Sequence, residues 1–187
     1  MMCPQDLLDG MDGVALLLDR DLNITAGGWK NWSLFWRANG GVMPAPSVLG
    51  GDITRAFAPG PVRAAFRAAL LGVVAGERPP LRLEFRCDSP RVQRRMHLSV
   101  TPCGPGLLYH ALLLSERPWP MRPLPLPPEP PVRCTLCGRV PAPEPDAGGA
   151  TQAGALDWVA PAWPAPEAGA GAEHDLCPRC HLALAAA

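Results

Sequence analysis

The sequence predicts an α+β domain with a mainly antiparallel sheet, followed by a small cysteine-containing tail. Two observations predict the domain: segments with apolar residues at alternate positions stand at both of its ends, and a stripe of helical period lies between them. Strands followed by helices and again by strands are typical of this fold class. Two Cys-x-x-Cys pairs after a proline-rich stretch predict the tail.

The first two strands are predicted within MDGVALLLDRDLNITA, residues 11–26. The apolar run VALLL ends in the acidic turn DRD and LNIT alternates, so two strands fit better than one helix. A helix is predicted next, because apolar residues crowd one side of WKNWSLFWRANGG at helical spacing: Trp29, Trp32, Leu34, Phe35 and Trp36. Such aromatic residues usually belong to a core, although they can also stack on a planar ligand.

The clearest helix is predicted within DITRAFAPGPVRAAFRAALLGVVAGE, which starts at Asp52. Pro61 suits a first helical turn, apolar residues then recur every three or four positions, and Gly76 is a stop signal. The preceding GGDI, residues 50–53, is interpreted as a turn and helix cap. Two strands with alternating apolar residues are expected to follow at 81–87 and 94–102, and a third strand, more apolar throughout, at 107–116.

This order of elements resembles the PAS domain, a sensory fold with a five-stranded antiparallel sheet flanked by helices on one face. The resembling segments are GVALLLDRDLNITA, VLGGDITRAF, VRAAFRAALLGVVAGE, LRLEFRC, RRMHLSVTP and LLYHALLLSER, which together span about Met11 to Arg117. The resemblance implies that residues 1–117 form a PAS-like sensory domain. It also implies binding of a small ligand or a protein partner, and a homodimer.

The cofactor signatures of this family are missing, so the ligand of the domain stays unknown. Haem-binding members commonly use a histidine on the long helix, and VRAAFRAALLGVVAG contains none. By alternation with its neighbours His97 should point away from the apolar face, whereas His110, in a more apolar strand, is expected to be buried with its hydrogen bonds satisfied. NWSLFW has Trp32 where flavin-based light sensors carry a reactive cysteine.

Charge and motifs exclude several function classes. The formal net charge is zero, with 17 basic and 17 acidic residues, so no global field attracts nucleic acid or an anionic membrane. No apolar run approaches a membrane span, and the first residues lack a signal-peptide pattern, which predicts a cytoplasmic protein. The P-loop, GxSxG and HExxH signatures are absent, so no enzyme is predicted. The bias of basic residues to arginine, with Lys30 the only lysine, suggests a GC-rich bacterium.

A proline-rich linker is predicted at 118–131, PWPMRPLPLPPEPP. Its 14 residues can extend over about 40 Å as polyproline II, either as a spacer or as a docking motif for a partner. The tail at 132–187 contains low-complexity sequence between its two cysteine pairs, Cys134 with Cys137 and Cys177 with Cys180.

Four thiolates in two CxxC pairs are the ligands of a structural Zn²⁺ site. The 39 residues between the pairs exceed the usual spacing, but loop closure costs only about 0.6 kcal/mol per doubling of length. A redox pair, a disulfide or an iron–sulfur cluster are the alternatives, and His174 or His181 can replace a cysteine. The tail resembles one seen after receiver or PAS domains in bacterial signalling proteins, through these residues: Cys134, Cys137, Gly138, Trp158, His174, Cys177, Pro178 and Cys180.

The sequence therefore predicts a bacterial signal-transduction sensor or adaptor: a PAS-like domain, a linker and a zinc-ribbon-like tail. The alternative is a zinc-containing transcriptional regulator that contacts nucleic acid through the tail and through PRVQRR, residues 90–95.

Overall fold

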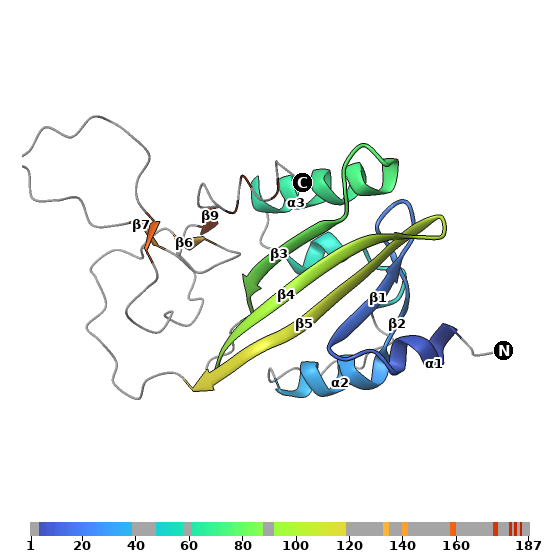
Figure 1. The fold of residues 1–187 in the computed structure, drawn as a ribbon, viewed down its shortest axis with the longest axis horizontal. Helices are drawn as coiled ribbons and strands as arrows, with labels where there is room; N and C mark the ends of the chain where they lie inside the picture. The colour runs from blue at the N-terminus through green and yellow to red at the C-terminus, as the bar shows by residue number, and fades with distance from the viewer. Residues whose placement is uncertain are drawn as a thin grey trace, which may run out of the picture.

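The computed structural model describes residues 4–38, 48–57, 61–87 and 92–118, and short pieces of the tail at 133–134, 140–141, 158–159, 174–175, 180, 182 and 184. Its described helices are α1 (Pro4–Asp9), α2 (Trp29–Ala38), the 3-10 helix η2 (Ile53–Ala56) and α3 (Pro61–Ala75). The five longest described strands are β1 (Val14–Leu18), β2 (Ile24–Gly27), β3 (Leu81–Arg86), β4 (Val92–Cys103) and β5 (Gly106–Pro118). They form one antiparallel sheet in the order β2-β1-β5-β4-β3 (Figure 1), which confirms the predicted α+β class.

The centre of the sheet is the pairing of β1 with β5, in which Val14 lies opposite Ala111 and Leu18 opposite Leu107. A glycine precedes the pairing on each strand. A Cβ atom on Gly13 would lie 2.3 Å from the Ala111 carbonyl oxygen, and one on Gly106 would lie 1.9 Å from the Leu18 oxygen. Only a residue without a side chain permits the two backbones to approach this closely.

The core fills the space between one face of the sheet and α3. Alternate strand residues point inward, and the α3 residues at three- and four-residue spacing meet them. The fully buried members include Leu16, Leu81, Leu98, Val100 and Leu107 from strands, and Val62, Phe66 and Leu70 from α3. The Phe66 ring also packs against that of Phe57, with centroids 4.0 Å apart.

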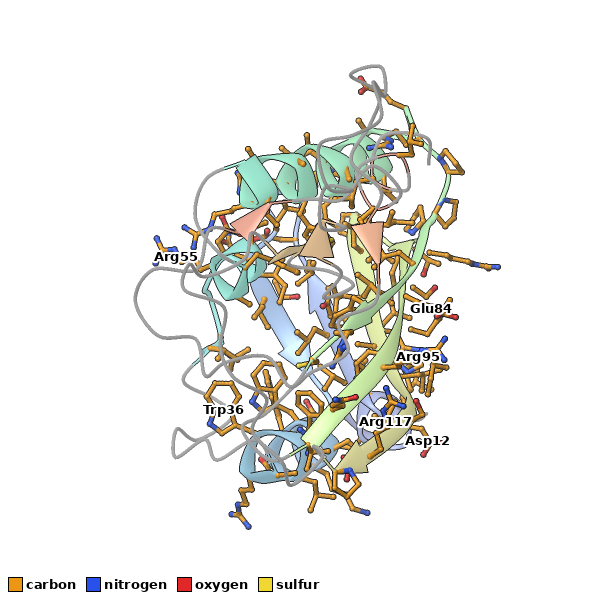
Figure 2. All side chains as sticks on the ribbon, turned by 90° about the vertical axis from the view of Figure 1, so that its left-hand side faces the viewer. Asp12, Trp36, Arg55, Glu84, Arg95 and Arg117 are labelled. Carbon is orange, nitrogen blue, oxygen red and sulfur yellow. The ribbon has the colours of Figure 1, made fainter. Side chains whose placement is uncertain are left out.

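The opposite face of the sheet is polar over β3 and β4. Arg82, Glu84 and Arg95 are exposed there, and Arg95 pairs with Glu84 at 2.6 Å. Figure 2 shows Glu84, Arg95 and Arg117 on one side of the molecule and Trp36 and Arg55 on the other. Over β3 and β4 the sheet is thus buried on one face only, as the alternation in the sequences of these two strands predicts.

Helix α1 was not predicted, because six residues are too few to display a helical period. It is fixed by contacts with distant residues: Leu8 is buried, and the Gln5 side chain donates a hydrogen bond of 2.8 Å to the Gly27 carbonyl. Gly28 allows this approach, since a Cβ atom there would meet the Leu8 oxygen at 2.5 Å. Tertiary contact, rather than local sequence, determines this helix.

The prediction for α2 is correct in its position but wrong for Leu34, which is 59% exposed. Residues two apart on a helix point about 200° apart, so Leu34 lies opposite Trp32 and Trp36. Trp29, Trp32 and Phe35 pack against the core, but no α2 residue is fully buried. The helix is therefore laid against the edge of the core rather than inserted into it.

The predicted turn and cap are confirmed. Asp19 Oδ1 in the DRD turn accepts hydrogen bonds from the backbone N–H groups of Asp21 and Asn23. Leu22 in the same turn has a left-handed φ of 71°, a conformation costly for leucine, and its complete burial offsets that cost. Asp52 accepts hydrogen bonds from the N–H of Thr54 at 2.8 Å and its hydroxyl at 2.7 Å, which caps η2.

Asp52 also ties η2 to α3, because Arg67 lies 2.7 Å from its other carboxylate oxygen. Burial acts to raise the pKa of Asp52, but the Thr54 hydrogen bonds and the nearby Arg67 charge outweigh it and hold the pKa below its usual value. The pKa of Asp19 is lowered as well, by hydrogen bonds from Asn23.

Removing the Phe66 ring should test the core. We expect Phe66→Ala to lower the free energy of unfolding by about 3–5 kcal/mol, because it leaves a cavity between α3 and the sheet. Denaturant unfolding measures the change. Ala64→Ser on the exposed side of α3 is the matched control and should cost under about 0.5 kcal/mol. Equal effects of the two substitutions would contradict the described core.

Acid should destabilise the domain partly through Asp52. A carboxyl whose folded pKa is depressed contributes stability above the unfolded pKa of about 3.9, and this contribution is lost as pH falls through the lower folded pKa. Asp52→Asn keeps a capping side chain but cannot titrate, so its unfolding midpoint should fall less steeply with acid than that of the parent. Asp21→Asn, at an exposed position, is the control. Superimposable pH profiles for the parent and Asp52→Asn would refute the assignment.

Candidate functional site

A short parallel pairing in the tail joins the start of the first cysteine motif to the residues just before the second. Strand β6 (Arg133–Cys134) pairs with β9 (His174–Asp175), so that Arg133 lies opposite His174 and Cys134 opposite Asp175. In the sequence, Cys137 follows Cys134 by three residues and Cys177 follows Asp175 by two. The pairing therefore spans the 39-residue separation that made the spacing unusual.

Two of the four predicted ligands lie within the described residues, and both are buried. Cys134 is 0% exposed and Cys180 is 7% exposed, and both belong to the same apolar cluster as the sheet core. Cys137, Cys177 and the alternative ligand His181 lie outside the described residues. A dry environment disfavours an isolated thiolate, but it suits a thiolate bound to a cation. The described donors thus fit a thiolate site for Zn²⁺.

No group of three metal-binding side chains occurs among the described residues, which contain only half of the predicted ligand set. His174, the other alternative ligand, is placed by its pairing with Arg133. A second small sheet joins β7 (Val140–Pro141) to β8 (Trp158–Val159), where Trp158 lies opposite Pro141. The predicted linker at 119–131 lies outside the described residues, whereas Pro118 ends β5.

A second candidate site lies along α2. Trp29 and Trp32 meet edge to face with ring centroids 6.5 Å apart, and Trp32 and Trp36 stack at 5.9 Å. The rings therefore stack mainly on one another. Within the described part of the chain the buried indole N–H of Trp36 has no hydrogen-bond acceptor. Because a buried donor without an acceptor is costly, this N–H is suited to meet an acceptor on a bound molecule.

The inward face of the sheet adds a phenol to the interior. Tyr109 on β5 is 7% exposed. Burial, together with the nearby Cys87, raises the pKa of Tyr109. Its hydroxyl therefore stays protonated at neutral pH and remains a hydrogen-bond donor.

For the two histidines on the sheet, the predicted orientation is confirmed for His97, and the predicted burial is wrong for His110. His97 faces away from the core, since Met96 and Leu98 on either side are buried, as predicted. His110 was expected to be buried, but it is half-exposed on the outer side of β5. Its Nε2 atom lies 2.7 Å from the Asp12 carbonyl oxygen, so the expected hydrogen bond is present. The expectation of burial failed because β5 is apolar on both faces.

Two arginines of the PRVQRR segment, Arg94 and Arg95, form ion pairs within the described part of the chain. Arg94 is only 3% exposed, pairs with Glu116 at 2.7 Å, and reaches toward the Ala38 carbonyl oxygen at 3.4 Å. This carbonyl ends α2, where a cation is favoured by the helix dipole. Arg95 pairs with Glu84 across the strands. Alternation alone did not predict the burial of Arg94, which lies beyond a β-bulge between Arg95 and Met96.

Comparison with known proteins identifies no relative: no family model matches the chain, and no curated protein matches it. None of the described helices is long and apolar enough to span a membrane. Functional inference therefore depends on the fold and on these two candidate sites.

The sequence placed Trp36 in an aromatic group that packs in a core or stacks on a planar ligand, and only the structure distinguishes its buried N–H. Arg78 was not singled out, although its guanidinium donates a hydrogen bond to the Leu184 carbonyl in the tail. A lone arginine beside two prolines carries no signal for such a distant contact.

Zinc binding should depend on Cys134 and not on cysteine content in general. We expect the purified protein to hold one Zn²⁺ per chain and Cys134→Ser to lose most of it, because a hydroxyl is a poor replacement for a thiolate ligand. Elemental analysis after gel filtration measures this. Cys103→Ser, at an exposed cysteine at the end of β4, is the matched control. Equal zinc content in the two variants would rule out the assignment.

Proposed function

We propose that this chain is a bacterial signal-transduction sensor or adaptor without catalytic activity. In this proposal residues 1–117 form a PAS-like domain that binds a small ligand or a protein partner, and residues 132–187 hold a structural Zn²⁺ through Cys134, Cys137, Cys177 and Cys180. The protein would act in the cytoplasm. The single observation that carries the proposal is the five-stranded antiparallel sheet with its core against α3 on one face, which is the architecture that the resemblance implies.

The sensory half of the proposal draws support from the interior of the domain. The buried Trp36 N–H and the protonated Tyr109 hydroxyl are both donors within a largely apolar setting. Binding sites for small molecules are typically apolar with a few polar groups that orient the ligand. A ligand, or a partner segment, with a hydrogen-bond acceptor beside a planar apolar group matches the Trp36 N–H and the neighbouring Trp32 ring.

The structural half draws support from the tail. Zn²⁺ held by four thiolates has no open coordination position, so it stabilises a fold instead of activating a substrate. Cys134 and Cys180 come from the two cysteine pairs, and the β6–β9 pairing joins the segments that carry those pairs. When bound, the metal crosslinks these segments and contributes its binding free energy to folding.

A homodimer is part of the proposal, as the resemblance implies. The outer face of the sheet offers a surface for it, since Leu17 on β1 and Leu108 and Leu112 on β5 are only half-buried there. Apolar residues grouped on an uncovered sheet face are typical of association surfaces.

Nucleic-acid binding is the alternative function, and the ion pairs of the PRVQRR segment make it the weaker candidate. Arg94 and Arg95 are already paired with Glu116 and Glu84, which leaves the segment with less free positive charge for phosphate contacts. A salt-dependent mobility shift of DNA or RNA with the purified protein would favour the alternative over the sensor.

Native mass spectrometry of protein purified from its source should test metal, ligand and oligomeric state together. We expect a dimer with one Zn²⁺ per chain and an additional bound small molecule or partner. Trp36→Phe removes the N–H but keeps an aromatic ring, and should reduce retention of that molecule by about tenfold, the value of one hydrogen bond. Trp29→Phe is the control. A monomeric protein that retains no molecule in the parent form would refute the sensory half.

A further inference from the structure

We propose that the tail is seated against α3 and the residue Arg78 just after it, through β9 and Leu184, and that Zn²⁺ controls this seating. This inference depends on the structural zinc site proposed above. The tail and the domain are then not two independent modules, because specific contacts join the tail to α3 and to the residues just after it.

The first contact is a hydrogen bond from Arg78 to the tail. Arg78 follows α3 in the connection to β3, and its guanidinium donates to the Leu184 carbonyl. Leu184 is the last described helical residue of the chain. Carbonyl groups that lack an N–H donor within their helix are commonly satisfied by an arginine side chain, which also interacts favourably with the helix dipole.

Gly72 of α3 creates the space for this arginine. A Cβ atom at Gly72 would lie 2.4 Å from Cδ and 2.8 Å from Cγ of Arg78. The aliphatic part of the arginine therefore lies across the helix where a side chain is missing. Glycine costs about 1 kcal/mol relative to alanine inside a helix, and the passage of Arg78 gives a structural reason for its presence.

The second contact is apolar. Cys180 and Leu184, four residues apart with helical backbone, are both buried, whereas Leu182 between them is 62% exposed. Residues four apart share a helix face, so this segment buries one face. Cys134, Cys180 and Leu184 belong to one apolar cluster with the core residues of α3 and the sheet. The cluster therefore crosses from the domain into the tail.

The third contact places the paired segment itself. Strand β9 lies against α3 and pairs with β6, and Figure 1 shows β6 and β9 on the side of the N-terminal end of α3 and the arrowhead of β3. Strands of two residues cannot hold their positions alone. Since they carry or adjoin the proposed zinc ligands, removal of the metal should release them, and with them the contacts of Leu184 and Arg78.

The coupling between zinc binding and the seating of the tail on α3 must act in both directions. If Zn²⁺ holds the tail on α3, then loss of the Arg78 contact weakens zinc binding, and removal of zinc exposes α3. We expect backbone amides of α3 to exchange with solvent about fivefold faster or more after zinc removal. We also expect Arg78→Ala to raise the zinc dissociation constant by about fivefold or more.

The experiment uses the full chain with zinc added or removed by a chelator, and combines hydrogen exchange of α3, competition for zinc and metal content. Gly72→Ala is the second variant, because alanine favours the helix while its Cβ atom displaces Arg78. A weaker contact between the tail and α3 in this variant cannot then be attributed to misfolding. Arg82→Ala, at an exposed arginine on the outer face of β3, is the matched control. Arg78→Ala and Gly72→Ala should hold one Zn²⁺ per chain at saturation and lose the zinc dependence of α3 exchange, while Arg82→Ala should keep it.

Three results would overturn the inference. If the parent protein binds one Zn²⁺ per chain but hydrogen exchange of α3 does not change when zinc is removed, the seating is refuted. The proposed zinc site is then retained. The same loss in Arg82→Ala as in Arg78→Ala would show a general effect of charge. A parent protein that binds no zinc would remove the proposed zinc site and the seating together, and metal content separates this result from the first.

Discussion

Strand β1 pairs along its length with β5, and this pairing joins the beginning of the domain to the end of it. The two strands form the middle of the sheet, so β2 can be added only on one side of them, and β4 and β3 only on the other. Gly13 and Gly106 permit the backbones to meet at the two ends of the pairing. The inward residues of both strands belong to the core that α3 closes, and α3 itself packs over the neighbouring strands β4 and β3.

Much of this arrangement could be predicted, because it depends on patterns within single segments. Alternation in LRLEFRC and RRMHLSVTP indicates strands with one buried face, and the spacing of Val62, Phe66 and Leu70 indicates the buried side of α3. The Asp52 cap was readable from GGDI, since a carboxylate before a helix has a local partner. In each case the residues that determine the structure are neighbours in the sequence.

What could not be predicted depends on residues far apart in the chain. Helix α1 is fixed by Gly27 and Gly28, the burial of Arg94 by Glu116, and the contact of Arg78 by Leu184. The cysteine motifs are an intermediate case. Their spacing predicts a shared cation, but only the pairing of β6 with β9 shows that Cys134 lies opposite Asp175, two residues before the second motif. The outward position of His110 was missed because β5 is apolar on both faces, which removes the signal that distinguishes them.

The contact between Arg78 and Leu184 has a consequence for the order of events during synthesis. The ribosome makes β1 to β5 and α3 before the second cysteine pair, so the sheet can be complete while the closing part of the tail is still being translated. The tail would then meet a surface that is already formed, and its ordering would be the last step of maturation. A chain terminated before Leu184 would keep all five strands of the sheet but never acquire this contact.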